Sequence, residues 1–161
     1  MISETLNAIL YFLEKTEGVE QSEIHHPEGD VLNHSLQVLE WAFRESDDID
    51  LIIAAMLHDT GKAVRGHGHE KTILDLLSPH TSAKTLWLIE HHMRIWDYIL
   101  GDMKKYSKCI YLATHPWLPE LIQLARWDKL GRNPNKKMIY DKEMIAIKIS
   151  DKAKLHFRGT N

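Results

Sequence analysis

The longest wholly apolar stretch of the chain, Leu51-Ile-Ile-Ala-Ala-Met-Leu57, most constrains how the chain can fold. Segment 49–59 is apolar on every side, which is typical of a helix buried at the centre of a domain. A buried strand is the competing interpretation, but Ala-Ala-Met favours a helix and no partner strand is evident. The stretch is far shorter than the roughly 20 residues that a membrane span needs. We therefore expect a central helix against which the rest of the chain packs.

Helical periodicity runs through nearly all of the remaining sequence. Apolar residues recur at spacings of three and four in a first segment that starts after Ser3, a predicted N-cap, and stops before Gly18. Segment 19–30 contains Gly, Pro and several charges and is predicted to be a loop. Later helices are predicted from Asp30 to about Arg44, at 49–59 and 69–77, from Ser82, at 104–114, from Pro119, and from Asp141 to about Leu155. The sequence thus predicts a compact all-α domain of about six to eight helices.

A single domain is expected over residues 1–161, because no repeat, low-complexity tract or linker interrupts the sequence. The 43% hydrophobic and 27% charged residues exclude a disordered or fibrous protein. One cysteine, Cys109, excludes a disulfide framework and a cysteine-based zinc site. The first residues, Met1-Ile2-Ser3-Glu4, lack the basic-then-apolar order of a signal peptide. We therefore expect a cytoplasmic protein that does not contact a membrane.

Histidine is unusually frequent, with 11 residues in the chain, and imidazole is the commonest metal ligand. His34 falls on the apolar stripe of its predicted helix, the pair His58-Asp59 follows the most apolar helix, and Asp128 falls on an inward-facing position. For each residue alone, a hydrogen-bonded buried polar group is the simpler interpretation. Together they favour a shared divalent cation, which would remove the cost of burying all four. Nitrogen and oxygen ligands of this mix suit first-row ions from Mn to Zn.

These residues follow one another in an H…HD…D order, and residues 57–62 read LHDTGK. This pattern resembles the HD-domain superfamily of metal-dependent phosphohydrolases and its "LHDxGK" signature. From about residue 25 to 132 the chain is most similar to the HD domain of bacterial tRNA nucleotidyltransferases. The nucleotidyltransferase head of those enzymes has no counterpart here, so we do not expect nucleotide addition to tRNA ends. The further matching segments are His26-Pro27-Glu28-Gly29-Asp30-Val31, Gly68-His69-Glu70, His92-Met93-Arg94 and Ala125-Arg126-Trp127-Asp128-Lys129-Leu130-Gly131-Arg132.

The resemblance implies an all-helical HD fold and a divalent metal centre held by the four residues above. Candidate ions are Mn, Mg, Ni, Co, Fe and Zn, with one or two bound per chain. Binuclear members of the superfamily imply that Asp59 bridges two ions and that His69 and His92 are additional ligands. His91 is the alternative to His92, since adjacent histidines both serve as ligands in some relatives.

Catalytic roles follow from the same centre. A metal ion that lowers the pKa of bound water supplies hydroxide near neutral pH, which makes its ligand Asp59 a predicted catalytic residue. Lys62, three residues later, is predicted to offer its charge to a substrate phosphate; a solvated lysine is the alternative. Arg94 and Arg126 are candidate phosphate ligands, although a surface salt bridge is the simpler interpretation for each.

The resemblance implies hydrolysis of phosphoesters such as 2′,3′-cyclic phosphodiesters, nucleotides or small phosphomonoesters, with an RNA 3′ end as a further candidate. The alternative is a catalytically silent HD domain that binds a nucleotide, RNA or a partner protein. A third hypothesis is RNA binding through a basic stretch, for which a solvated helical face is the simpler explanation at a net charge of −3. The native metal, the substrate and the oligomeric state stay open. The basic stretch consists of Arg126, Lys129, Arg132, Lys136 and Lys137.

Overall fold

The regular structure of the chain is helical. The computed structural model describes residues 2–64 and 69–158, apart from the side chains of residues 69 and 157. Within these ranges the chain forms nine α-helices and one 3-10 helix and contains no strand, which confirms the all-α prediction. In chain order the elements are α1 (Glu4–Glu14), α2 (Val31–Glu45), α3 (Ile49–Leu57), η1 (Thr60–Ala63), α4 (His69–Leu77), α5 (Ala83–His91), α6 (Ile95–Leu100), α7 (Tyr106–Ala113), α8 (Leu118–Leu130) and α9 (Lys142–Arg158).

Helix starts lie where the capping residues predict them. The side chain of Ser3 accepts a hydrogen bond from the backbone N–H of Leu6 at 3.2 Å, and α1 begins at the next residue. Asp30 caps α2 and Ser82 caps α5 in the same way. A side-chain oxygen at this position satisfies a backbone N–H that has no partner inside the helix. Short-range sequence signals therefore determine where these helices begin.

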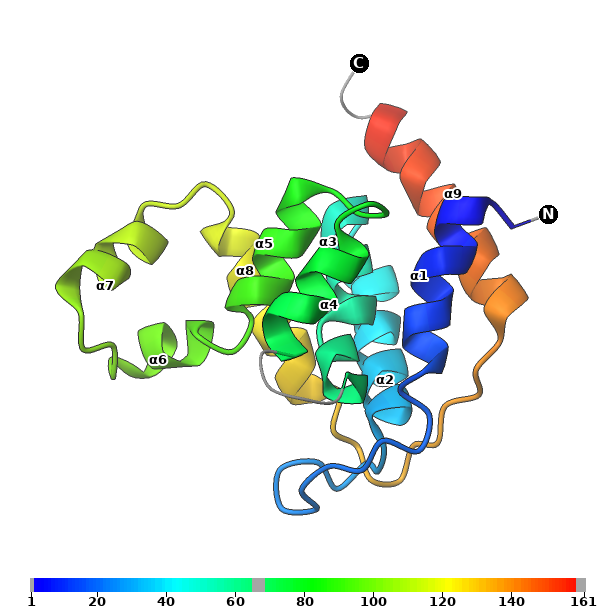
Figure 1. Ribbon diagram of the computed structural model, residues 1–161, viewed down its shortest axis with the longest axis horizontal. Coiled ribbons are helices and arrows are strands. Elements are labelled where there is room, and N and C mark those ends of the chain that lie inside the picture. The colour runs from blue at the N-terminus through cyan, green and yellow to red at the C-terminus, as the bar shows by residue number, and fades with distance from the viewer. Residues whose placement is uncertain (1, 65–68, 159–161) are drawn as a thin grey trace.

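Helix α3 forms the centre of the fold (Figure 1). All seven residues from Leu51 to Leu57 are buried, and α1, α2, α5, α8 and α9 all contact this helix. Burying a side chain such as Leu or Ile contributes roughly 1.5–3 kcal/mol, so α3 is a major source of stability. The predicted central helix is confirmed and the strand alternative is wrong. Among the described residues no helix combines the length and the apolar character that crossing a membrane requires.

Helix α6 is the one helix that the sequence does not predict, and it brings the number within the described residues above the expected eight. It has six residues, of which Ile95 alone is buried, so it is too short to show a helical periodicity. It ends at Gly101, whose φ of 73° suits glycine. Helices α6 and α7 together project from one side of the molecule in Figure 1, and α6 contacts α8.

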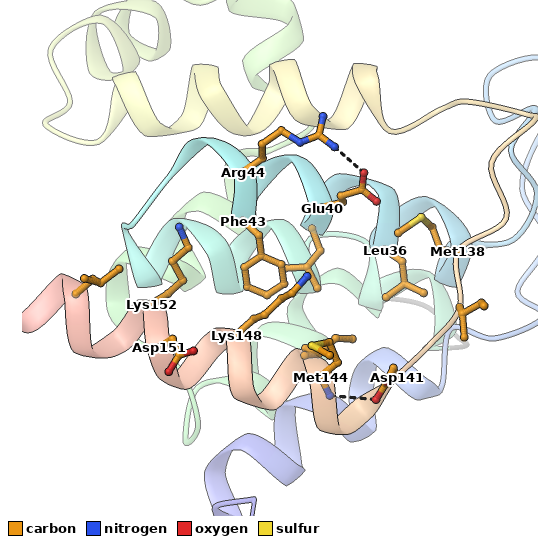
Figure 2. A pocket seen from close by; sticks show the side chains of 14 residues that line it. Leu36, Glu40, Phe43, Arg44, Met138, Asp141, Met144, Lys148, Asp151 and Lys152 are labelled. Carbon is orange, nitrogen blue, oxygen red and sulfur yellow. Dashed lines mark hydrogen bonds and ion pairs between the residues drawn. The ribbon is translucent and has the colours of Figure 1, made fainter.

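A groove of about 590 Å³ lies between α2 and α9 (Figure 2). Apolar side chains such as Phe43 and Met144 line it together with charged side chains of both signs. Arg44, for example, forms an ion pair with Glu40 at 2.9 Å. No histidine is among the described residues that line this groove. The predicted metal ligands therefore lie elsewhere.

Candidate metal centre

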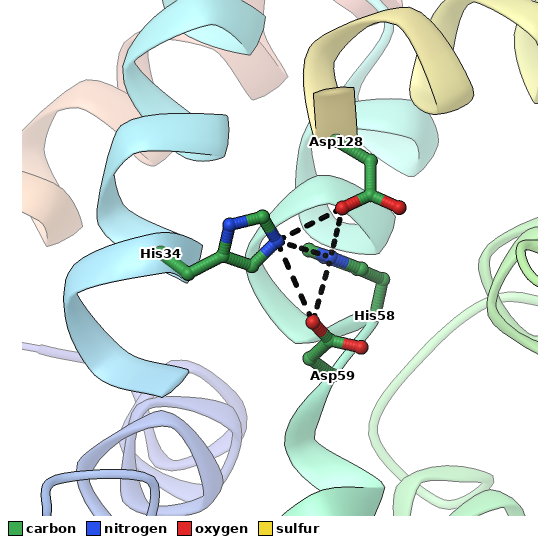
Figure 3. A group of neighbouring side chains, drawn as sticks. All are labelled: His34, His58, Asp59 and Asp128. Atoms are coloured by element: carbon green, nitrogen blue, oxygen red, sulfur yellow. Dashed lines mark hydrogen bonds and ion pairs between the residues drawn. The ribbon is translucent and has the colours of Figure 1, made fainter. Parts of the chain in front are cut away.

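Four side chains from three separate parts of the chain meet in the interior. His34 comes from α2, His58 and Asp59 from the turn that follows α3, and Asp128 from α8. One possible ligand atom from each lies within 4.8 Å of the others, and Figure 3 shows the four side chains pointing toward one another. None is more than 5% exposed. The structure thus brings together all four residues of the predicted metal centre, which we call the quartet.

The end of α3 explains how two consecutive residues reach the same point. Side chains of neighbouring residues in a continuous helix point about 100° apart. Here the α-helix ends, and Asp59 has φ −105° and ψ 7° before η1 begins. The turn is held by the hydroxyl of Thr60, which donates to the carbonyl of Leu57 at 2.7 Å. His58 and Asp59 can therefore both face the interior.

The close approach of α8 to α2 places Asp128 beside His34, with 2.9 Å between Asp128 Oδ1 and His34 Nε2. At the end of α8, a Cβ on Gly131 would lie 2.6 Å from Val38 Cγ2 and 3.1 Å from the backbone nitrogen of Val38. The carbonyl oxygen of Gly131 lies 2.9 Å from His34 Nδ1. Glycine suits this position because a Cβ would force Val38 or the backbone of the two helices to shift.

The donors and acceptors of the quartet fit a divalent cation. Nδ1 of His34 and Nδ1 of His58 lie 2.9 and 2.8 Å from the carbonyl oxygens of Gly131 and Ala55, so each ring carries a proton at Nδ1. In the neutral rings both Nε2 atoms are then acceptors, and they lie only 3.3 Å apart. The nearby carboxylate oxygens of the quartet are acceptors as well. Such a shell of lone pairs is satisfied by a bound cation or by additional protons, and its nitrogen and oxygen atoms suit first-row divalent ions.

The charges and hydrogen bonds within the quartet shift the pKa values of its members in opposite directions. Burial alone would lower the pKa of His58, but the charge of Asp59 and hydrogen bonds to both carboxylates raise it to about 10. Burial would raise the pKa of Asp59, yet the charge of His58 holds it well below its usual range. The pKa of Asp128 is also lowered, since hydrogen bonds from His34 and His58 outweigh its burial. Metal ions and protons therefore compete for the same atoms.

His92, at the end of α5, lies beside the quartet. Its Nε2 is 3.3 Å from Asp59 Oδ1, and its ring centre is 5.2 Å from that of His58. Its Nδ1 lies 2.6 Å from the carbonyl oxygen of Ile89, which fixes the proton there and leaves Nε2 as an acceptor. Within the described residues, this buried Nε2 has no hydrogen-bond partner of good geometry. His92 Nε2 therefore points toward the Asp59 carboxylate but forms no hydrogen bond with it.

His91 makes its contacts away from the quartet. Its Nδ1 lies 2.9 Å from the carbonyl oxygen of Trp87, and its ring stacks on the Trp87 ring at 4.4 Å between centres. Of the two adjacent histidines, the structure thus brings His92 and not His91 to Asp59. The side chain of His69, the first residue of α4, lies outside the described residues.

A cavity of about 670 Å³ opens beside the quartet and has Asp59 and Asp128 in its wall. Two cationic side chains in the same wall each approach one of these carboxylates. Lys62 Nζ lies 3.1 Å from Asp59 Oδ2 and donates to Gln21 Oε1 at 2.7 Å. The guanidinium of Arg132 lies 3.6 Å from Asp128 Oδ1 and donates to the backbone carbonyl of Asp128. The predicted position of Lys62 beside the centre is therefore found.

Arg94 and Arg126, the candidate phosphate ligands, are not among the described residues that line the cavity. Arg126 forms an ion pair with Glu45 and lies over the ring of Trp41 at 5.7 Å. Arg94 is exposed and immediately precedes α6. The surface salt bridge that is the simpler interpretation is found for Arg126, and Arg94 is an exposed residue.

Most side chains of the basic stretch contact other groups of the same chain. Lys136 forms an ion pair with Glu40 at 2.5 Å, and Lys137 donates to the backbone carbonyl of Glu28 at 2.9 Å. With Arg126 and Arg132 paired as described above, Lys129 is the exposed member for which no such contact is found among the described residues. These contacts favour a structural role for the stretch over a continuous RNA-binding face.

Two residues near the centre are not predicted from the sequence as parts of it. The sequence indicates Arg132 only as a member of the basic stretch and of segment 125–132, which resembles the tRNA nucleotidyltransferases. Glu28, in the loop before α2, is completely buried, with Oε1 2.9 Å from His34 Nδ1. A carboxylate in a polar loop gives no sign of burial, and its place in the matched His26–Val31 segment is the only signal.

Comparison with known proteins agrees with this geometry. The family model of the HD domain matches residues 31–133, a range that contains the whole quartet. The multifunctional CCA protein of Halorhodospira halophila is 40% identical over 65 residues, which cover 36% of this chain and 16% of that protein. The multifunctional CCA protein of Teredinibacter turnerae is 41% identical over 61 residues, covering 34% of this chain and 15% of its own length. The chain therefore spans only about a sixth of the length of these relatives.

Proposed function

Because the chain belongs to the HD domain family, we propose that it is a divalent-metal-dependent phosphohydrolase. The observation that carries the proposal is the buried quartet, whose possible ligand atoms converge within 4.8 Å beside a cavity of about 670 Å³. A shell of acceptors without donors is costly to bury. A cation held at this point would offset that cost and would be accessible to a substrate in the cavity.

The bound metal ion would lower the pKa of a coordinated water and so supply hydroxide near neutral pH. The four residues of the quartet would hold this ion. His34 and His58 present Nε2, because backbone carbonyls hold their ring protons at Nδ1. Asp59 and Asp128 provide the negative charge that favours a divalent ion over a proton.

Asp59 is the proposed bridging ligand if two ions bind. Its Oδ2 lies 3.3 Å from His58 Nε2, whereas its Oδ1 lies 3.3 Å from His92 Nε2. The two oxygens thus face different imidazoles, which supports a second site shared with His92. His69 stays a proposed further ligand, and the number of ions per chain stays one or two.

Lys62 is the proposed phosphate-binding residue. Its side chain is 38% exposed and its ammonium lies beside Asp59 in the cavity wall. A point charge at this place would neutralise a phosphoryl oxygen as charge develops on it. Arg132 lies in the same wall beside Asp128 and is a second candidate.

The proposed substrates are 2′,3′-cyclic phosphodiesters, nucleotides and small phosphomonoesters, including a phosphorylated RNA 3′ end. The cavity of about 670 Å³ falls in the range of roughly 300–1,000 Å³ that is usual for small-molecule sites. It therefore has room for a nucleoside as well as its phosphate.

A hydrolysis screen tests the proposal. The purified chain is supplied in turn with Mn²⁺, Mg²⁺, Co²⁺, Ni²⁺ and Zn²⁺ and incubated with cyclic nucleotides, nucleoside monophosphates and an aryl phosphate. We expect metal-dependent hydrolysis that is lost in Asp128→Asn, which keeps the shape of the side chain, and retained in Arg126→Ala. A chain that binds metal and hydrolyses none of these compounds would contradict the proposal and favour a catalytically silent HD domain.

A further inference from the structure

The carboxylate of Glu28 is completely buried, although Glu28 belongs to the loop before α2. Its backbone carbonyl accepts hydrogen bonds from Asn33 Nδ2 and Lys137 Nζ, both at 2.9 Å. These contacts anchor the loop to α2 and to the segment that follows α8. The backbone of Glu28 is therefore fixed by two hydrogen bonds at its carbonyl oxygen.

One oxygen of this carboxylate serves two histidines. Oε1 lies 2.8 Å from Nδ1 of His26 and 2.9 Å from Nδ1 of His34. The other oxygen, Oε2, is buried and has no hydrogen-bond partner in the part of the chain that the structure describes. A buried acceptor without a partner costs about 1–3 kcal/mol. A contribution to stability therefore does not explain a glutamate at this position. An effect of its negative charge on His34 does explain it.

His34 directs its two ring nitrogens to different groups. Nδ1 faces Glu28 and the Gly131 carbonyl, whereas Nε2 faces Asp128 at 2.9 Å and His58 at 3.3 Å. Nδ1 of His26 and Nδ1 of His34 both approach Oε1 of Glu28, so this carboxylate lies behind the nitrogen of His34 that faces away from the quartet. The hydrogen bond to the Gly131 carbonyl keeps the His34 proton at Nδ1 and the lone pair at Nε2, and the Glu28 carboxylate lies 2.9 Å from the same Nδ1.

We propose that Glu28 is a positioning residue of the metal centre: its carboxylate orients His34 and makes Nε2 a stronger ligand. The inference rests on the metal site of the proposed function. A carboxylate behind a ligating imidazole raises the basicity of the ligand, and its loss typically weakens metal affinity about 10–100-fold. The Gly131 carbonyl helps to orient the same ring but carries no full negative charge. The Glu28→Gln protein is therefore expected to bind metal about tenfold more weakly or worse.

A titration with Co²⁺ tests this role. Calorimetry and the visible absorption of the bound ion monitor the binding. Glu28→Gln keeps the size of the side chain and removes its charge. The expected result is a higher dissociation constant with unchanged stoichiometry and an altered Co²⁺ spectrum. Glu28→Asp, which keeps the charge, is expected to recover part of the affinity and serves as the second variant if Glu28→Gln does not fold.

Thr85→Val is the matched control for lost stability. Thr85 is 1% exposed and donates its hydroxyl to the carbonyl of Asp50 at 2.8 Å. Asp50 lies in the first turn of α3, at the end away from His58. Thr85→Val should lower the free energy of unfolding and leave the Co²⁺ affinity unchanged. If Glu28 had only a structural role, Glu28→Gln should give the same result.

The outcomes distinguish the proposed metal site from the positioning role of Glu28. A wild-type chain that does not bind Co²⁺ would overturn the proposed function together with this inference. A wild-type chain that binds Co²⁺ and a Glu28→Gln chain of equal affinity would overturn the positioning role alone. Loss of one whole equivalent of Co²⁺, with unchanged affinity for the remaining ion, would also overturn it, since Glu28 would then be a ligand with His26.

Discussion

The substitution Gly131→Ala adds one methyl group where the end of α8 lies against α2. The φ of Gly131 is −78°, a value that any residue adopts, so backbone strain does not contribute and the effect is steric. The added Cβ would meet Val38 Cγ2 at 2.6 Å and the backbone nitrogen of Val38 at 3.1 Å. Val38 is fully buried, so its side chain has no free space to move into. The Val38 side chain or the backbone of the two helices must therefore shift.

The size of the expected loss in stability follows from this contact. Overpacking a close-packed interior costs typically about 1–3 kcal/mol. A loss of about 2 kcal/mol lowers the Tm of a chain of this size by roughly 4–8 °C. Metal affinity should fall as well, because the same displacement moves Asp128 and the Gly131 carbonyl away from His34, which both contact.

A double-mutant cycle measures the contact itself. Urea unfolding followed by circular dichroism is recorded for the wild type, Gly131→Ala, Val38→Ala and the double variant. Val38→Ala removes Cγ2 and leaves a cavity that the new methyl group partly fills. The double variant should therefore be more stable than the sum of the single effects by about 1 kcal/mol. Strict additivity, or a Gly131→Ala chain as stable as the wild type, would refute the packing argument.

Three further predictions concern the centre and its surroundings. Lys62→Ala should lower kcat about a hundredfold and leave metal content unchanged, as steady-state kinetics and elemental analysis would reveal; unaltered kcat would remove Lys62 from the site. Arg126→Ala should leave kcat unaltered and cost less than about 1 kcal/mol in urea unfolding, because its ion pair with Glu45 lies at the surface; a large drop in kcat would contradict this placement. The pKa of His58 is raised from 6.5 to about 10, so its contribution to stability is complete below about pH 6.5 and is lost as the pH rises toward 10. The free energy of unfolding of the metal-free chain should therefore fall over that range in a series of urea titrations, and a constant or rising value would be the contrary result.

The positions of most helices could be predicted because they depend on neighbouring residues. The hydroxyl of Ser3 and the carboxylate of Asp30 cap helices in the structure as their sequence context predicts. Helix α6 could not be predicted, since its six residues bury only Ile95. Such a short helix forms through contacts with the rest of the fold rather than through its own periodicity.

The quartet could be predicted because charged or polar residues on buried helix faces require partners. Which of His91 and His92 approaches Asp59 could not, because adjacent residues differ by about 100° around α5 and the packing of that helix decides between them. His91 stacks on Trp87, and His92 faces Asp59.

Helix geometry also explains why Arg126 does not line the cavity that Asp128 lines. Two residues apart on α8, Arg126 and Asp128 point about 200° away from each other. Arg132 lies beyond the end of α8 at Leu130, and its Nε donates to the backbone carbonyl of Asp128 at 3.2 Å, which places it in the cavity wall.

The metal content of the wild type and of Asp59→Asn tests the central claim most directly. Both proteins are supplemented with divalent ions, freed of unbound metal and subjected to elemental analysis, with circular dichroism as the check on folding. We predict at least one equivalent of a divalent ion per wild-type chain and its loss from a folded Asp59→Asn chain. A wild-type chain without metal under every supplementation, or equal metal content in the two proteins, would contradict the assignment of the quartet as a metal centre.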